Sequence, residues 1–283
     1  MSFTNQVEEM VSLLRAANEK TIQPLFGKVT TEVKERIGDF EEEVTQADTD
    51  SSDFILSRIR GKMPGSYSEE DITDERFNYP LLWQLDTLDG TTEFGAGMAN
   101  GYAMHAALLQ RQRGLYVPVA GIVFRPGTDT IWTHDGNVVR RIQDGEVSPM
   151  VPADRDSIRG YVRAVDPNDR VGEFYETLGQ KLGLPVKKIL SGGSGASLVD
   201  LLEGNLNLVV MNYDYTKEWD LAMAVPIVEA RGGWVCDLNG NDFTFNRPYE
   251  ERHNRNGYVM SIAFTKDEVL PEIKDDLLIR TLD

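Results

Sequence analysis

The chain has 283 residues, enough for one large domain or two closely joined ones with a sizeable core. Its 46 acidic and 29 basic residues give a net charge of −17, which disfavours a nucleic-acid scaffold because phosphate-backbone binding needs clustered positive charge. No apolar run approaches the roughly 20 residues of a spanning helix, and the first residues lack a signal-peptide pattern. We therefore expect a globular, cytoplasmic protein. Its single cysteine, Cys236, excludes an internal disulfide and a cysteine-rich metal site.

Two helices are predicted near the start of the chain. The first is amphipathic and ends before Pro24, because its apolar positions repeat at helical spacing: Val7, Met10, Val11, Leu14 and Ala17. A polar stretch, 38–50, follows it. A second helix is indicated by Phe54, Ile55 and Ile59. Its expected caps are Thr49, Ser51 or Ser52, which would leave Asp48 just ahead of the helix.

The segment that follows is rich in strands. Residues 81–85 form an apolar run that stops at Asp86 and reads as a buried strand. Short apolar or β-branched runs come after it, at 102–109, 117–124, 130–133 and 138–142. Glycine-containing turns separate these runs, as at 135–137. We therefore predict an antiparallel meander.

The second half alternates between strands and helices. Strands are expected at 161–165, 186–190, 206–211, 234–237 and 258–263, and helices at 171–182, 196–202, 218–230 and 270–278. The change of pattern predicts stacked α and β layers in two lobes, 1–150 and 151–283, with a join near 145–160. The fold class is therefore α/β (α+β).

The segment most informative about chemistry is 83–94, where an apolar strand ends in two aspartates, Asp86 and Asp89. Gly90, Thr91 and Thr92 follow at once and can open a short helix. Both carboxylates can then face one pocket at a strand end, where α/β folds place their ligands. Closely spaced carboxylates together with a backbone carbonyl suit a hard cation such as Mg2+. An ordinary Asp-Gly turn is the alternative explanation.

Three more acidic residues extend this pattern. Glu69 lies in a polar loop upstream, Asp48 follows Val44-Thr45-Gln46-Ala47, and Asp220 stands at the start of an apolar helix. Each has a simple structural explanation, because solvated loops and helix N-termini both favour carboxylates. Their joint occurrence in this order carries the functional signal.

In this set of motifs the sequence resembles the inositol monophosphatase superfamily of Mg2+-dependent phosphomonoesterases. Residues 86–91, Asp-Thr-Leu-Asp-Gly-Thr, match its Asp-Pro-[Ile/Leu]-Asp-Gly-Thr segment except at Thr87. Three further segments are similar to family motifs: Val44 to Asp48, Glu69-Glu70, and Trp219-Asp220-Leu221-Ala222 with Gly232-Gly233 after it. The resemblance runs from about residue 7 to residue 263. It implies a layered α-β-α-β-α sandwich of the sugar-phosphatase type, with the metal site at the junction of two lobes.

The resemblance also assigns roles. The expected ligands of two or three Mg2+ ions are Glu69, Asp86, Asp89, Asp220 and the carbonyl of Leu88. Asp48 and Thr91 would orient and deprotonate the attacking water. The backbone N–H groups of Gly90, Thr91 and Thr92 would cradle the phosphate, and Gly193 and Ser194 would border the rest of the substrate. Inhibition by Li+ and a homodimer are implied as well.

Different motifs of the sequence indicate two different classes of substrate. Glu93-Phe94 and Glu218-Trp219-Asp220 resemble the family's 3'(2'),5'-bisphosphate nucleotidases, whereas Thr91-Thr92 and Val228-Glu229-Ala230 resemble the inositol enzymes. A bisphosphate nucleotide is slightly favoured, and inositol monophosphate or another sugar or polyol phosphate is the alternative. Thr87 and Arg231 depart from the family pattern and could alter the Leu88 carbonyl and the substrate side.

Other functions fit the residues less well. A haloacid-dehalogenase motif needs a single residue between its aspartates, and here Thr87 and Leu88 both intervene. Residues 192–196 lack the last glycine of a serine-hydrolase elbow, and 95–101 match a dinucleotide loop only loosely. The three histidines, His105, His134 and His253, are interpreted as ordinary core or surface residues. A catalytically silent member that binds a phosphorylated ligand or a protein partner is the remaining alternative.

Overall fold

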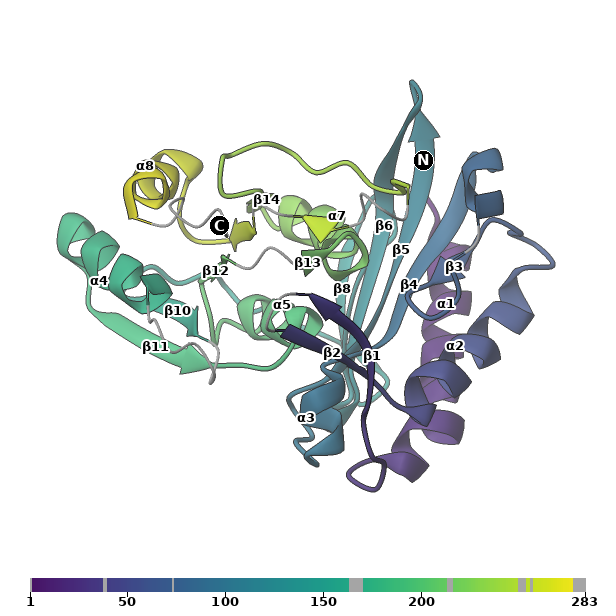
Figure 1. Cartoon of the computed structure of the whole chain (residues 1–283). Coiled ribbons are helices and arrows are strands. Elements are labelled where there is room, and N and C mark those ends of the chain that lie inside the picture. Colours follow the sequence, from purple (N-terminus) through teal and green to yellow (C-terminus); the bar gives the residue numbers. More distant parts are fainter. Residues whose placement is uncertain are drawn as a thin grey trace.

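The computed structural model describes residues 2–37, 40–72, 74–162, 170–212, 216–248, 253–254 and 257–276. Its elements form five layers, as Figure 1 shows. Helices α1 (Thr4–Ala17) and α2 (Gln46–Ile59) cover one face of a large sheet. A smaller sheet lies beyond the large one and is covered on its outer face by α4 (Arg170–Leu182) and α8 (Lys266–Asp276). Between the sheets lie α5 (Ser194–Leu202), α6 (Trp219–Ala222) and α7 (Ala224–Ala230). This arrangement confirms the expected α-β-α-β-α sandwich.

The large sheet has seven strands in chain order, from β3 to β9. Only β3 (Tyr67–Ser68) and β4 (Leu81–Asp89) pair in parallel. From β4 onward each strand pairs antiparallel with the next, which confirms the predicted meander. The remaining strands are β5 (Ala103–Gln112), β6 (Leu115–Arg125), β7 (Thr130–His134), β8 (Val139–Gln143) and β9 (Glu146–Ser148).

The smaller sheet has the order β11-β10-β12-β16-β14. β10 pairs in parallel with both β11 and β12. β16 pairs antiparallel with both of its neighbours, β12 and β14. The strands are β10 (Ile158–Val162), β11 (Val186–Leu190), β12 (Leu208–Met211), β14 (Trp234–Cys236) and β16 (Tyr258–Ser261). The predicted end of the first strand, 163–165, and of the last helix, 277–278, lie outside the described residues. Cys236 is fully buried, as expected of a core thiol.

The first 45 residues differ most from the sequence-based expectation. Helix α1 continues as a π-helical turn (Asn18–Ile22) and a 3-10 turn (Gln23–Leu25). A hairpin of β1 (Glu32–Ile37) and β2 (Phe40–Val44) then occupies part of the stretch expected to be irregular. Helix α2 starts at Gln46 with Thr45 as its cap, so Asp48 lies inside the first turn rather than ahead of the helix. The shorter elements are 3-10 turns Asp74–Asn78 and Pro126–Thr128, and strands β13 (Thr216–Lys217) and β15 (His253–Asn254).

Three hydrophobic clusters match the layers. One joins α1 and α2 to the large sheet, and another joins the small sheet to α4 and α8. The cluster between the sheets combines residues of both halves of the chain, such as Trp132 with Leu201. The boundary at residue 150 falls between β9 and β10 and stays a prediction.

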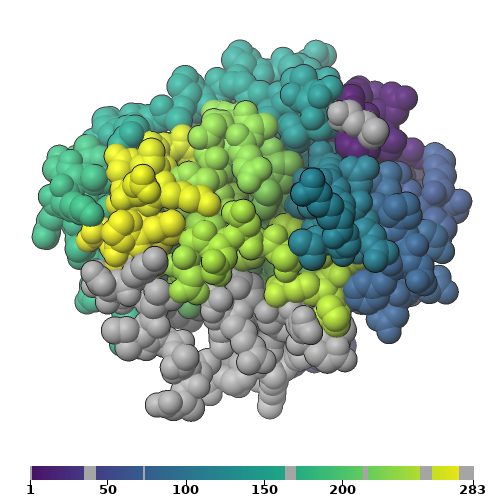
Figure 2. All heavy atoms as spheres, turned by 90° about the horizontal axis from the view of Figure 1, so that it is seen from above, coloured from purple at the N-terminus to yellow at the C-terminus, as the bar shows by residue number. Residues whose placement is uncertain are grey.

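The first and last helices of the described part of the chain, α1 and α8, pack on different sheets. In Figure 2, α8 (yellow) lies across the molecule from the purple N-terminal residues. Among the described residues, none of the helices has the length and apolar content that a bilayer crossing requires.

Asp135 fastens the start of α1 to the large sheet. Its Oδ2 accepts hydrogen bonds from the Thr4 hydroxyl (2.9 Å) and from Arg140 (2.7 Å), and its Oδ1 accepts from the backbone N–H groups of Asn137 and Val138. Burial raises the pKa of Asp135, but these bonds outweigh that effect and lower the pKa from 3.8 to about 2. The ionised carboxylate therefore stabilises the fold.

We predict that Asp135→Asn lowers the free energy of unfolding at pH 7 by about 2 kcal/mol. The depressed pKa means that the stabilisation is complete above pH ~4 and is lost as the pH falls toward ~2. Urea denaturation at several pH values between 3 and 7 should therefore show the two proteins converging toward acid. The exposed Asp53→Asn is the control. Equal unfolding free energies for wild type and Asp135→Asn at pH 7 would contradict the prediction.

Candidate active site

Asp86 and Asp89 lie at the end of β4, where its pairing with β5 is interrupted. Asp86 pairs with His105 and Asp89 with Ala103, so β4 carries two intervening residues where β5 carries one. In a regular strand, residues three apart face opposite sides of the sheet. The extra residue, a β-bulge, reverses that alternation, and the two carboxylates come to lie on the same side.

Glu69 and Asp220 reach this place from other segments. Glu69 directly follows β3, and its N–H donates to the carbonyl of Leu85 (3.0 Å). Asp220 lies in the first turn of α6, where its Oδ2 accepts from the Lys217 N–H (2.8 Å). Carboxylate oxygens of Glu69, Asp86 and Asp220 all lie within 4.8 Å of one another, and atoms of Asp86, Asp89 and His105 form a second such group.

The cluster is strongly negative. Burial, followed by repulsion from Glu69 and Asp89, raises the pKa of Asp86 well above its ordinary value. Burial and the same neighbours raise the pKa of Asp220 as well. Lys217 Nζ contacts Glu69 Oε1 (2.9 Å) and partly offsets this charge.

These donors fit divalent cations. Buried carboxylates whose pKa is raised by neighbouring negative charge, as those of Asp86 and Asp220 are, gain most from a bound cation, and oxygen ligands suit Mg2+. Asp86 is shared by both groups.

Asp48 and Thr91 form the expected pair beside this cluster. The Thr91 hydroxyl donates to Asp48 Oδ1 (3.0 Å) and also lies 3.3 Å from the carbonyl oxygen of Leu88. Asp48 Oδ2 accepts from the backbone N–H and the hydroxyl of Thr45, completing a capping box. Burial outweighs these hydrogen bonds and raises the pKa of Asp48 to about 7. Asp48 can therefore accept a proton near neutral pH.

The short helix α3 (Thr91–Gly95) opens where the sequence predicts it. Gly90 precedes it in the left-handed region, with φ = +88°. The first N–H groups of a helix have no partners within it, and such groups can bind an anion. The Thr92 side chain points elsewhere, because its hydroxyl donates to Glu43 Oε2 (2.6 Å).

Gly193 and Ser194 lie against Asp89. The Ser194 hydroxyl donates to Asp89 Oδ1 (3.1 Å), and the Gly195 N–H donates to Oδ2 (2.6 Å). A Cβ on Gly193 would come within 2.7 Å of the Asp89 carboxyl group, so this approach requires glycine. The start of α5 thus fixes the orientation of a candidate metal ligand.

Comparison with known proteins identifies the group to which this site belongs. The family model for the inositol monophosphatase family matches residues 6–265. The chain belongs to this family. The resemblance seen in the sequence motifs is thereby confirmed.

Relatives within the family differ in what their names describe. The chain is 23% identical to inositol monophosphatase 3 of Xenopus laevis, over 95% of this chain and 72% of the relative. It is 25% identical to the 3'-phosphoadenosine 5'-phosphate phosphatase of Mycobacterium leprae, over 88% of this chain and 91% of the relative. A crystal structure of an IMPase/NADP phosphatase complexed with Mg2+ and phosphate superimposes with a TM-score of 0.71. It covers 95% of both chains at 17% identity, which supports a common fold.

Two residues depart from the family motifs, and both make defined contacts. The Ser51 hydroxyl donates to Thr87 Oγ1 (2.7 Å), and Thr87 in turn reaches the carbonyl of Asp48 (3.4 Å). Thr87 therefore ties the bulge of β4 to the start of α2. Arg231 hydrogen-bonds the carbonyl of Val151 and lies over the Trp132 ring, 5.1 Å from its centroid.

Two residues beside the carboxylates, His105 and Lys217, are not predicted as site residues from the sequence. The pairing of β5 with β4 places His105 opposite Asp86. Lys217 lies just before α6, and the position of this helix beside the large sheet places it next to Glu69. No local pattern in the sequence indicates either contact. Glu218 is buried and accepts hydrogen bonds from Tyr67, Gln84 and the N–H of Arg247. Its contacts are thus structural.

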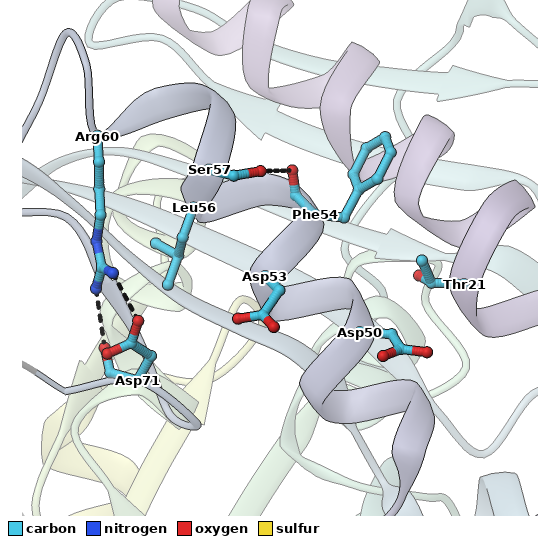
Figure 3. A pocket seen from close by; sticks show the side chains of 8 residues that line it. All are labelled: Thr21, Asp50, Asp53, Phe54, Leu56, Ser57, Arg60 and Asp71. Carbon is cyan, nitrogen blue, oxygen red and sulfur yellow. Dashed lines mark hydrogen bonds and ion pairs between the residues drawn. The ribbon is translucent and has the colours of Figure 1, made fainter.

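A surface hollow along α2 lies apart from this site. Figure 3 shows Asp50, Asp53 and Ser57 lining it, on the side of the helix opposite Asp48 by the helical period. The one arginine among its lining residues, Arg60, is paired with Asp71 (2.6 Å). This acidic hollow is a poor match for a phosphate.

Proposed function

We propose that this chain is a Mg2+-dependent phosphomonoesterase that hydrolyses a small-molecule phosphate ester with water as the nucleophile. One observation carries the proposal. Four carboxylates from three separate segments converge beside the Asp48–Thr91 pair. Such a charge concentration is unfavourable unless cations occupy it.

The residues proposed to hold two or three Mg2+ ions are Glu69, Asp86, Asp89, Asp220 and the carbonyl of Leu88. When bound, the metal supplies positive charge at the attacking and leaving oxygens of an in-line displacement.

The other groups act on water and phosphate. Thr91 would orient a water molecule through its hydroxyl, and Asp48 would accept the proton as the water oxygen bonds to phosphorus. The N–H groups of Gly90, Thr91 and Thr92 would bind phosphate oxygens. The ester bond breaks, the leaving oxygen takes a proton, and the products are an alcohol and inorganic phosphate.

A 3'(2'),5'-bisphosphate nucleotide is the substrate we favour. Glu93-Phe94 supports it, as does similarity to a relative named for 3'-phosphoadenosine 5'-phosphate. Inositol monophosphate is the alternative, supported by Thr91-Thr92 and by the inositol monophosphatase relative. The segment Glu218-Trp219-Asp220 also resembles the bisphosphate nucleotidases, and Glu218 itself is buried and accepts a hydrogen bond from Tyr67. Gly193 and Ser194 are proposed to border the rest of the substrate.

The test is phosphate release from inositol 1-phosphate, adenosine 3',5'-bisphosphate and fructose 1,6-bisphosphate, each with Mg2+ or with a chelator. We expect turnover of one ester only with Mg2+. We expect it to be abolished in Asp89→Asn and unchanged in the exposed Asp53→Asn. A folded protein that binds Mg2+ but releases no phosphate from any of these esters would favour a silent, ligand-binding member.

Three further properties are part of the proposal. Li+ should inhibit by competing at a metal position, and full activity at high Li+ would contradict this. We also propose a homodimer and a cytoplasmic location, which sedimentation and fractionation would test.

A further inference from the structure

His105 is a buried histidine that faces the acidic cluster. It lies on β5 directly opposite Asp86, and its side chain is 1% exposed. Its Nε2 has no hydrogen-bond partner among the described residues. Nε2 lies 3.6 Å from Asp86 Oδ2 and 4.0 Å from Asp89 Oδ2. A buried polar atom without a hydrogen-bond partner lowers the stability of a protein, so most such atoms have a partner or bind a ligand.

The distances fit a shared cation better than direct hydrogen bonds. Both exceed the range of a hydrogen bond. Two ligand atoms on one ion, each at a bond length of about 2.1 Å, lie at most about 4.2 Å apart. Both separations fall within that limit.

The two carboxylates retain coordination capacity on the side that faces His105. Asp86 Oδ1 accepts from the Leu88 N–H (3.1 Å), whereas Oδ2 is the atom nearest His105. Asp89 Oδ2 accepts from the Gly195 N–H (2.6 Å) and has a second lone pair. The contacts of Asp89 with Ser194 and Gly195 fix it in place for binding.

We propose that His105 Nε2 is a metal ligand together with Asp86 and Asp89. This position then selects a divalent cation that accepts nitrogen, such as Mn2+, over Mg2+. The inference rests on the proposed function in taking these carboxylates as ligands. The chemical reason for the selectivity is that Mg2+ prefers oxygen donors, whereas an imidazole nitrogen favours transition metals. The rival explanation is that His105 serves only as a counter-charge to the two carboxylates.

Pulsed electron paramagnetic resonance of the Mn2+-loaded protein distinguishes these explanations without measuring activity. We expect one Mn2+ ion, within a titration up to three equivalents, to couple to a histidine nitrogen. The coupling should change when the protein is made with 15N-labelled histidine. It should disappear in both His105→Asn and His105→Val, and persist in His134→Asn, a matched change on β7. The labelling experiment uses the unaltered chain and does not depend on the variants folding.

Competition titrations supply the second readout. We expect the ratio of Mn2+ to Mg2+ affinity to fall by about tenfold or more in His105→Asn and to be unchanged in His134→Asn. Absence of histidine coupling at every loading, or failure to bind Mn2+, would overturn the inference. Phosphate release without the coupling would leave the proposed function standing alone. Coupling without phosphate release from any ester would support this inference and count against that function.

Discussion

Asp48→Asn is expected to lower kcat by a factor of about 10^2 to 10^4, the contribution typical of a positioned general base. Asp48 is 4% exposed and accepts a hydrogen bond from the Thr91 hydroxyl (3.0 Å). Burial raises the pKa of Asp48 to about 7. An asparagine of the same shape can still accept the Thr45 N–H and so keep the helix cap. It cannot take a proton from water. Steady-state kinetics with the preferred ester and saturating Mg2+ measure the effect.

Asp50→Asn is the matched control for this change. Asp50 lies on the same helix, on its outer face, where it accepts from Gln46 (2.7 Å). We expect this variant to keep the wild-type kcat, and both variants to keep the wild-type melting temperature within a few degrees. A kcat for Asp48→Asn within threefold of wild type would remove Asp48 from the base role.

Gly90→Ala is expected to lower the free energy of unfolding by about 2 to 4 kcal/mol and to abolish phosphate release. Two effects add at this position. A φ of +88° strains any residue with a Cβ, and that Cβ would stand 2.6 Å from the carbonyl oxygen of Gly101. Relief of the overlap must shift the backbone on either side of Gly90, at Asp89 and Thr91. The Thr91 hydroxyl also lies 3.3 Å from the Leu88 carbonyl oxygen, so that contact shifts as well. Urea denaturation and the phosphate assay measure both losses.

Gly114→Ala separates the two effects. Gly114 has nearly the same φ, +90°, but a Cβ there would meet nothing within 4 Å. We expect this control to lose about 1 kcal/mol of stability and to keep full activity. Equal destabilisation by the two substitutions would mean that the approach of Gly101 does not constrain Gly90.

Local sequence patterns predict much of this architecture. The helical spacing of apolar residues in α1 and the alternation of short apolar runs with turns in the meander are signals carried by neighbouring residues. The β1–β2 hairpin was not predicted, because its strands, Glu32–Ile37 and Phe40–Val44, are dominated by charged residues and lack an apolar pattern. The start of α2 was misplaced because several serines, threonines and aspartates there are all acceptable caps.

In the candidate site, too, local sequence identifies the residues, whereas long-range packing determines their positions. By itself, the sequence determined the chemical groups, namely the Asp86 to Thr91 motif, Glu69, Asp48 and Asp220, together with the family that uses them in this order. Only the tertiary structure decided that a bulge turns Asp86 and Asp89 to one side of the sheet. It also decided that Lys217 and His105 join them. The physical reason is that strand register and the crossing of α6 over the sheet depend on long-range packing, which no short stretch of sequence encodes.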